Sequence, residues 1–272
     1  MEILCSTGNF IGYRNGYNFH LLEKAEKVLS CRGFEVLLPF EGYDCFEVAE
    51  FIIKKNIFCP VIHADKRIGE FLSTRTPKTS HKALSIFDEN CRFANCVRAN
   101  AVVLHLWGGS YSDKSIKYNL NMYAELEQIA KRNNIKLMIE NVPCIISDPL
   151  IYFEMLYERY KDVLFTYDTR FAAFHSMQFD YFYNKSILDR IHHIHVSDYC
   201  GGKKEWSKLN QIKNIGKGIV DFKRLFDVIN AKVICDYITV EVPGYRDYQC
   251  DFTEIETNIQ KIKKYVKGDM DA

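Results

Sequence analysis

Residues 191–199 read IHHIHVSDY, with three histidines inside four positions of an otherwise apolar, β-branched run. Side chains of a β-strand alternate between its two faces. Ile194 and Val196 suit a buried face that packs on helices, which turns His193 and His195 to the opposite face. The run therefore predicts a buried strand with imidazoles along one side, and the role of those imidazoles depends on the surrounding fold.

Seven other runs share this character, and segments of helical periodicity follow them. The strand-like runs are 2–6, 34–40, 56–64, 101–107, 135–141, 163–168 and 237–242, and the clearest helical segments are 20–33, 119–134, 220–231 and 252–268. Eight strands alternating with about eight helices predict an α/β protein with a (β/α)₈ TIM barrel fold. The rival, a doubly wound open sheet, carries a glycine fingerprint after its first strand, and STGNFIGYRNG (6–16) lacks that spacing.

The bulk composition is typical of a globular protein, with 47% hydrophobic and 26% charged residues. We expect a single domain over residues 1–272, because no Pro/Gly/Ser-rich linker interrupts the chain. The net charge of +1 gives no overall field that would favour nucleic acid or a membrane. The start, MEILCSTGNF, lacks the features of a signal peptide, and no apolar run approaches the roughly 20 residues of a membrane span. Ten scattered cysteines with no CxxC pair then predict reduced thiols in a cytoplasmic protein.

Strand alternation turns one polar side chain inward near the C-terminal end of six strands. These residues are His63, His105, Glu140, Asp168, His195 and Glu241. Active sites of TIM barrels lie at this end. Converging carboxylates repel one another and lose their hydration, and a divalent cation offsets both effects. Imidazole with carboxylate suits Zn²⁺, Mn²⁺, Fe²⁺ or Co²⁺ better than Ca²⁺. A single inward His or Glu is more often structural, but six together predict a metal site. We expect structural roles for His192, which faces the helices, and for His193, which lies a layer deeper than His195.

The ordered set of motifs around these residues resembles the xylose isomerase-like TIM barrel superfamily. This superfamily holds sugar isomerases and epimerases together with apurinic endonucleases of the endonuclease IV type. The matching pieces span nearly the whole chain and are VIHA (61–64), VVLHLWGG (102–109), MIENVP (138–143), TYDT (166–169), HIHVSD (193–198), NIGKGIVDF (214–222) and VEVPG (240–244).

The isomerase and epimerase branch implies one divalent metal held by a Glu–Asp–His–Glu set. By resemblance this set is Glu140, Asp168, His195 and Glu241, and the two glutamates also act as catalytic base and acid. The expected cofactor is Zn²⁺, Mn²⁺, Co²⁺, Fe²⁺ or Mg²⁺, one or two ions per chain. The resemblance therefore implies a metal-dependent isomerase or epimerase acting on a sugar, a polyol or a related hydroxy-carbonyl compound.

The endonuclease branch implies three zinc ions and is the alternative function, a metal-dependent phosphodiester hydrolase. His63, His105 and Glu140 match its first site, so a second metal or a substrate contact at the two histidines stays open. Its third site needs a histidine where this chain has Phe171 and a ligand triplet where this chain has residues 210–212, NQI. The resemblance thus counts against a conventional three-zinc enzyme.

We expect the residues that determine substrate specificity among the aromatic and cationic side chains near the strand ends. Aromatic rings suit the CH face of a sugar, although they are also ordinary hydrophobic cover. The candidates for substrate binding are Trp107, Phe171, Lys217 and Tyr245. We expect a small sugar-like substrate in preference to nucleic acid, and no association with a membrane. The sequence is compatible with a homo-oligomer and leaves the oligomeric state open.

Overall fold

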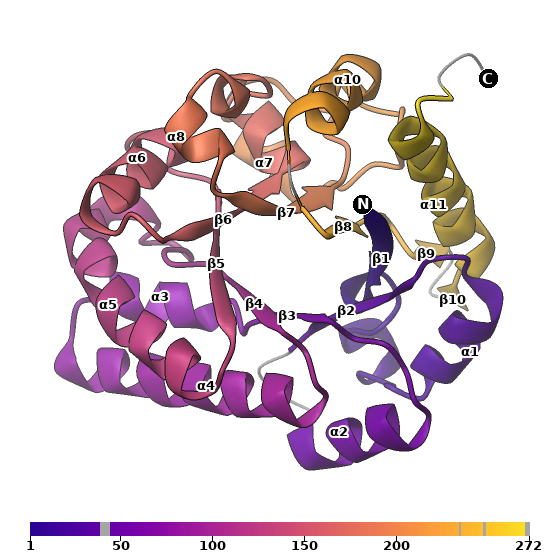
Figure 1. Ribbon diagram of the computed structural model, residues 1–272, viewed down its shortest axis with the longest axis horizontal. Helices are drawn as coiled ribbons and strands as arrows, with labels where there is room; N and C mark the ends of the chain where they lie inside the picture. Colours follow the sequence, from indigo (N-terminus) through magenta and orange to yellow (C-terminus); the bar gives the residue numbers. More distant parts are fainter. Residues whose placement is uncertain (39–43, 234, 247–248, 270–272) are drawn as a thin grey trace. The chain divides into compact units, whose positions relative to one another are not determined.

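The computed structural model describes residues 1–38, 44–233, 235–246 and 249–269, and its elements are labelled in Figure 1. Eight parallel strands follow one another in chain order as a closed barrel, which confirms the predicted TIM barrel fold. The strands are β1 Glu2–Ser6, β2 Gly33–Leu37, β3 Val61–His63, β4 Ala101–Leu104, β5 Lys136–Glu140, β6 Leu164–Asp168, β7 Ile191–Val196 and β8 Tyr237–Val240. A short antiparallel pair, β9 Tyr245–Arg246 and β10 Gln249–Cys250, follows β8.

Helices separate the strands, as the periodicity predicts. They are α1 Leu21–Val28, α2 Cys45–Lys54, α3 Arg67–Ser73, α4 Pro77–Cys96, α5 Ile116–Arg132, α6 Pro149–Arg159, α7 Thr169–Phe174, α8 Lys185–Leu188, α9 Trp206–Leu209, α10 Phe222–Lys232 and α11 Phe252–Lys267. Several begin at an aspartate whose side chain accepts a backbone N–H of the first turn, as Asp148 does for α6 and Asp251 for α11. Proline at the first position of α4 and α6 has no N–H to satisfy there, so it favours the helix start.

The strand of residues 56–64 is shorter than the sequence predicts. Only β3, Val61–His63, forms within this run, and it starts directly after Pro60. Proline has no N–H to donate to a neighbouring strand, so ladder pairing begins one residue later. The strand predicted over 34–40 ends at Leu37, and its residues 39–40 lie outside the described part of the chain.

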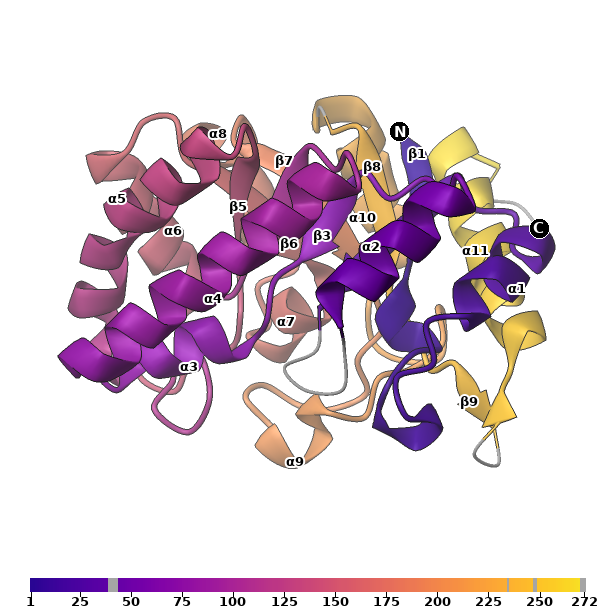
Figure 2. The ribbon, with the colours of Figure 1, turned by 90° about the horizontal axis from the view of Figure 1, so that it is seen from below.

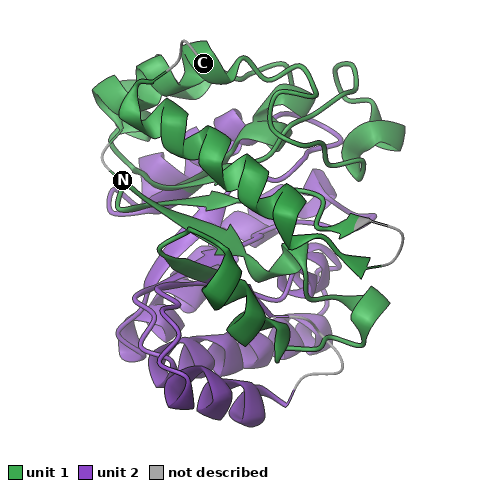
Figure 3. Cartoon of the chain, turned by 90° about the vertical axis from the view of Figure 1, so that its right-hand side faces the viewer, with its two compact units in different colours: residues 1–34, 166–272 green, residues 35–165 purple. Residues whose placement is uncertain are grey.

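The chain forms two compact units, coloured in Figure 3. Unit 1 comprises residues 1–34 and 166–272, and unit 2 comprises residues 35–165. In unit 1, β8 pairs with both β1 and β7, and His195 lies opposite Thr239. In unit 2, β3 pairs with β4 and β4 pairs with β5. The prediction of one domain over 1–272 stays a prediction.

Each unit has its own buried apolar interior. In unit 1 the rings of Tyr167 and Tyr181 meet edge to face, 5.2 Å apart. In unit 2 Phe153 stacks on Phe165 at 3.9 Å. These fully buried aromatic side chains fix the strand positions, and therefore the positions of the strand ends, because closely packed interiors resist small shifts. Among the described residues, the helices are too short or too polar to cross a membrane.

Candidate functional site

Three of the four predicted metal ligands lie together in unit 1. One ligand atom each from Asp168, His195 and Glu241 lies within 4.8 Å of the others. Asp168 and His195 are fully buried, whereas the Glu241 side chain keeps 13% of its surface exposed. Nδ1 of His195 lies 4.0 Å from Oε1 of Glu241. Two carboxylates and one imidazole at this spacing surround a volume that suits a single divalent cation.

Local backbone interactions fix each member of this cluster. Asp168 ends β6 and caps α7, because its Oδ1 accepts the Phe171 N–H at 2.7 Å. Of its two oxygens, Oδ2 is therefore the one that would coordinate a metal ion. Glu241 follows the last residue of β8, and its N–H donates to the Val196 carbonyl at 2.9 Å, which extends the pairing with β7.

A threonine next to Asp168 ties the β6 end to the β7 end. The Thr169 hydroxyl donates to the Ser197 carbonyl at 2.6 Å and accepts the Ser197 N–H at 2.9 Å. Both backbone groups of Ser197 are thus satisfied by one side chain. The predicted ligands Asp168 and His195 therefore lie near strand ends that are held in fixed register, which is the preorganisation that a metal site needs.

The fourth predicted ligand, Glu140, lies in unit 2 with the two additional histidines. Its Oε2 is 2.6 Å from Nε2 of His105 and 3.4 Å from Nε2 of His63. The two imidazole rings meet edge to face with centroids 5.0 Å apart. Glu140 is the last residue of β5, His63 the last of β3, and His105 follows the last residue of β4. These three side chains therefore lie close together in unit 2, and their role as metal ligands or substrate contacts stays a prediction.

The tautomer of His63 points to a cation in this cluster. Nδ1 of His63 lies 2.9 Å from the Ala64 carbonyl, which can only accept, so Nδ1 carries the hydrogen. In the neutral ring Nε2 is then an acceptor, and it faces the carboxylate oxygen of Glu140. Two facing acceptors need a proton or a metal ion between them. A backbone carbonyl that holds the second ring nitrogen is also the common partner of a metal-binding histidine.

His105 is suited to coordinate as a neutral imidazole. Burial lowers the pKa of His105 to about 4, and the nearby Glu140 carboxylate opposes this shift without reversing it. The ring is therefore uncharged at neutral pH, and metal coordination requires the uncharged form. The cluster in unit 1 and the cluster in unit 2 each combine imidazole nitrogen with carboxylate oxygen. Such a donor set suits a divalent transition metal of intermediate softness.

A structural role for His193 stays a prediction, and one contact within the sheet supports it. His193 is buried, and its Nε2 lies 3.0 Å from the Thr239 hydroxyl on the paired strand β8. A buried ring that finds a polar partner within the sheet needs no ligand to explain it.

The four predicted substrate-binding residues differ in their surroundings. Trp107 of unit 2 is fully buried, and its indole N–H donates to the Val142 carbonyl at 3.3 Å. In unit 1, Phe171 is buried, Tyr245 is half-buried and Lys217 is exposed. The Tyr245 hydroxyl has no hydrogen-bond partner among the described residues. Substrate contact by these four residues stays a prediction.

Asp198 is a buried residue whose role the sequence analysis missed. Its carboxylate accepts four backbone N–H groups, from Tyr199, Gly216, Gly218 and Val220, at 2.8 to 3.1 Å. This side chain holds the turn that carries Lys217. The N–H groups of Gly216 and Gly218 are used in these hydrogen bonds, so they are not available to a substrate. An aspartate directly before a glycine-rich segment was the available signal.

Arg170 is a second residue that the sequence analysis missed, although it directly follows the TYDT motif. Its side chain is buried on α7, with 6% of the residue exposed. Nη1 donates to the Leu209 carbonyl at 2.6 Å, and the guanidinium lies over the Phe171 ring at 4.3 Å. It thereby attaches the loop that contains α9 to α7, and Figure 2 shows α9 extending beyond α7.

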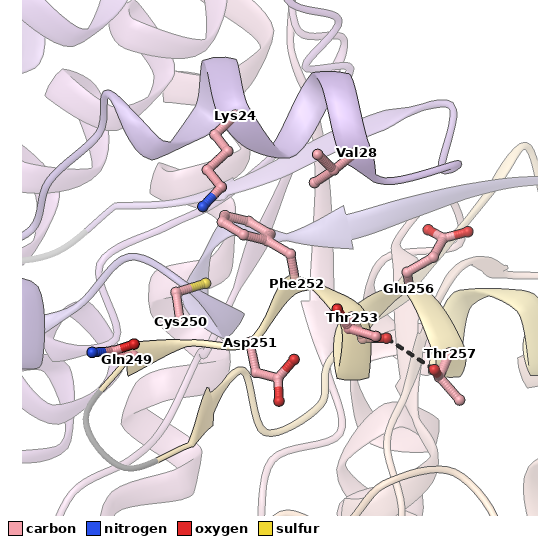
Figure 4. Close-up of a pocket in the computed structure, with 9 residues that line it drawn as sticks. All are labelled: Lys24, Val28, Gln249, Cys250, Asp251, Phe252, Thr253, Glu256 and Thr257. Carbon is pink, nitrogen blue, oxygen red and sulfur yellow. Dashed lines mark hydrogen bonds between the residues drawn. The ribbon is translucent and has the colours of Figure 1, made fainter.

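A surface pocket of about 800 Å³ in unit 1 lies between α1 and the start of α11 (Figure 4) and is lined by none of the candidate ligands. Lys24 lies over the Phe252 ring at 5.3 Å, and Asp251 caps α11. Oε2 of Glu256 accepts the Ser30 N–H at 2.8 Å. The acidic groups of this pocket therefore serve the local fold, and we assign it no catalytic role.

Solved structures of several sugar epimerases are similar to this chain. A structure of L-ribulose 3-epimerase has a TM-score of 0.75 and 12% identity, and the match covers 98% of this chain and 95% of that one. A D-tagatose 3-epimerase-like protein has a TM-score of 0.72 and 16% identity, with coverage of 98% and 97%. The IolI protein with a bound zinc atom has a TM-score of 0.72 and 13% identity, with full coverage of both chains. At these identities the likeness shows the fold alone.

The family assignment comes from sequence. A search of curated proteins gave no match. The model of the xylose isomerase-like TIM barrel family matches residues 23–267, which is most of the chain and includes all six candidate ligands. The motifs, the barrel topology and this match agree, so the chain belongs to the xylose isomerase-like TIM barrel family.

Proposed function

We propose that the protein is a divalent-metal-dependent isomerase or epimerase of a sugar, a polyol or a related hydroxy-carbonyl compound. The cluster of Asp168, His195 and Glu241 carries this proposal, because two carboxylates and an imidazole converge at the C-terminal strand ends. The names of the structural neighbours support it, since they include two sugar 3-epimerases or epimerase-like proteins and a zinc-bound IolI.

Glu140 is proposed as the fourth ligand and as one of the two acid/base groups. The TIM barrel fold brings the C-terminal ends of its strands to one face, and Glu140 ends β5. In unit 2 Nε2 of His105 and Nε2 of His63 lie 2.6 Å and 3.4 Å from its Oε2. A proton or a metal ion shared between these atoms would fix the orientation of the carboxylate, as a proton-transfer group requires.

The chemistry follows from the donor set. A bound divalent ion supplies polarisation of a carbonyl and a neighbouring hydroxyl, which lowers the cost of removing a proton from the adjacent carbon. One glutamate accepts this proton, and the other returns a proton to the opposite face or to the neighbouring carbon. Glu241 is the more exposed of the two, so it exchanges its proton with solvent more readily than the buried Glu140.

Solvent deuterium incorporation tests this proposal. The metal-loaded protein is incubated in D₂O with a panel of ketoses and inososes, and we expect deuterium at the carbon next to the carbonyl in at least one compound. The His195→Asn variant, which loses a proposed ligand, is expected to give no exchange. Absence of exchange across the whole panel with the wild-type protein would refute the proposed activity.

A second candidate, an endonuclease IV-like hydrolase, rests on the contacts of Glu140 with His63 and His105, which match the first zinc site of that branch. The position that needs a third-site histidine holds Phe171, whose ring is buried under the Arg170 guanidinium. Elemental analysis of the purified protein separates the two functions. One or two ions per chain agree with the isomerase, whereas three zinc ions with incision of an abasic duplex would favour the hydrolase.

A further inference from the structure

The loop between β7 and α10 concentrates positive charge. The loop, residues 197–221, contains five lysines and three acidic residues, a net charge of +2, whereas the whole chain carries +1. The lysines are Lys203, Lys204, Lys208, Lys213 and Lys217. This local excess sits directly after the strand that carries His195, so it lies in the loop layer where this fold builds its substrate sites.

The three acidic residues of the loop do not neutralise these lysines. Asp221 caps α10, because its Oδ1 accepts the Arg224 N–H at 3.1 Å. The Asp198 carboxylate accepts backbone N–H groups, as described above, and Oε2 of Glu205 accepts the Gly202 N–H at 2.8 Å. Two lysines elsewhere in the chain differ from these, since Lys131 pairs with Glu127 and Lys185 with Asp189.

Four of the loop lysines make no ion pair within the part of the chain that the structure describes. They are Lys203, Lys208, Lys213 and Lys217. A lysine whose charge is neutralised by a neighbouring carboxylate contributes little to the binding of an anion. A lysine without such a carboxylate raises the local concentration of anions. The loop therefore attracts a negatively charged group.

Arg170 adds a buried cation beneath this loop. The residue is 94% buried, since 6% of its surface is exposed, and within the described residues it makes no ion pair. A guanidinium has five N–H donors. Nη1 donates to the Leu209 carbonyl, whereas Nε is buried and has no hydrogen-bond partner among the described residues. A buried cation without a counter-charge is costly, and an anion that replaces the neutral carbonyl is the stronger partner.

We propose that Arg170 and the β7–α10 loop bind an anionic group, a phosphate or a carboxylate, of the substrate. This inference rests on the proposed isomerase or epimerase function and specifies its substrate class, a sugar phosphate or a sugar acid. Arg170 lies two residues after the ligand Asp168, and Thr169 between them bonds to the end of the His195 strand. The anion subsite and the metal cluster therefore belong to the same strand ends, and one substrate can reach both.

Calorimetric titration with inorganic phosphate at constant ionic strength tests the subsite without any catalytic step. The full-length protein is titrated before and after chelation of its metal, so that phosphate bound to metal is separated from phosphate bound to the loop. We expect binding to persist after chelation. Arg170→Met is expected to weaken binding at least about tenfold, because it removes a charged hydrogen-bond donor. Lys217→Ala is expected to weaken it about two- to fivefold.

Two further variants keep this test decisive. Since Arg170 is buried and its replacement risks misfolding, the exposed Lys217→Ala variant tests the subsite independently. Lys131→Ala removes a lysine on α5 of unit 2 and is the matched control, with unchanged phosphate affinity expected. Equal phosphate affinity in the wild type, Arg170→Met and Lys217→Ala would overturn the proposal.

Deuterium exchange then distinguishes the subsite from the proposed function. A ketohexose, its terminal phosphate monoester and the matching sugar acid are compared, and we expect KM for one anionic substrate to be at least about tenfold lower than for the neutral ketose. Exchange with a preference for the neutral ketose would overturn the anion subsite and leave the isomerase standing. Phosphate binding without exchange of any substrate would support the subsite and contradict the isomerase. Tighter binding of an abasic DNA duplex than of the phosphate monoester would overturn the small-molecule assignment.

Discussion

The surroundings of the Glu140 carboxylate are set by side chains from two neighbouring strands. His105 and His63 both approach Oε2 of this carboxylate, and the Ala64 carbonyl fixes the tautomer of His63. Each contact comes from the end of a different strand, so the arrangement requires β3, β4 and β5 to pair in their observed register.

Replacement of Glu140 by glutamine is the first prediction. The amide keeps the size of the side chain but removes its charge and its ability to accept a proton. We expect activity to fall about 10²- to 10⁴-fold, with weaker metal binding. His192→Asn serves as the control. His192 is half-buried and lies on the opposite face of β7 from His193 and His195, so this variant is expected to keep most of the activity. Similar losses in both variants, measured by deuterium exchange and metal content, would contradict the assigned strand faces.

At the scale of elements, buried aspartates hold the loops that follow the strands. Asp113 accepts backbone N–H groups of Ile145, Ile146 and Ser147 and the Tyr152 hydroxyl, which fixes the loop between β5 and α6. Asp198 does the same for the loop between β7 and α10. Loops anchored in this way present functional side chains on a rigid scaffold.

The second prediction concerns Asp113. Burial alone raises the pKa of this carboxyl, but hydrogen bonds from Ile146, Ser147, Tyr152 and Ile145 outweigh it and lower the pKa below its ordinary value. A lowered folded-state pKa stabilises the protein above the unfolded pKa of about 4, and this contribution disappears as pH falls through the folded value. Asp113→Asn should therefore lower the free energy of unfolding by about 1–3 kcal/mol at pH 7.

Chemical denaturation across pH checks the sign of this effect. The difference in unfolding free energy between the wild type and Asp113→Asn should be constant above about pH 5 and shrink below about pH 4. A difference that grows on acidification would show that Asp113 is not held by these hydrogen bonds.

The third prediction tests the loop after β7 through its glycines. A Cβ at Gly218 would overlap the Tyr199 carbonyl oxygen and the Asp198 carboxylate, whereas a Cβ at Gly202 would lie 3.7 Å from Oε2 of Glu205. Gly218→Ala should therefore destabilise the protein by about 1–3 kcal/mol, because the turn has to move away from Asp198. Gly202→Ala should be nearly neutral. Urea unfolding of both variants measures the contrast, and equal stabilities would argue against the close packing of this turn.

At the scale of the whole molecule, a bound metal ion is expected to stabilise the folded chain by mass action. At a free metal concentration one hundred times Kd the gain is about 2.7 kcal/mol. This gain corresponds to a Tm increase of about 5–10 °C for a chain of this size. Chelation should remove it, and a thermal melt with and without Zn²⁺ or Mn²⁺ measures the shift. The His195→Asn variant should show a much smaller shift, and an equal shift would place the ion elsewhere.

Much of the fold is readable from local sequence. Eight apolar, β-branched runs predict eight strands, and the helical segments agree in position with α1, α5, α10 and α11. The run of residues 56–64 is predicted too long, since apolar character alone does not reveal that the sheet pairing starts after Pro60. Glu241, predicted within its strand, follows the last residue of β8 for a similar reason, because hydrogen bonding to neighbouring strands decides where a strand ends.

The positions of the candidate ligands could also be predicted, because strand alternation is a local property. His63, Glu140 and Asp168 end their strands and His195 is one residue from the end of β7, whereas their role as ligands stays a prediction. The roles of Arg170 and Asp198 could not be predicted. Their partners, the Leu209 carbonyl and the amides of residues 216–220, lie about 20 to 40 positions away and become partners only when the loops fold back. The order of residues along the chain determined which side chains face the strand ends, whereas tertiary packing decided which buried charges are satisfied, because that depends on contacts between distant segments.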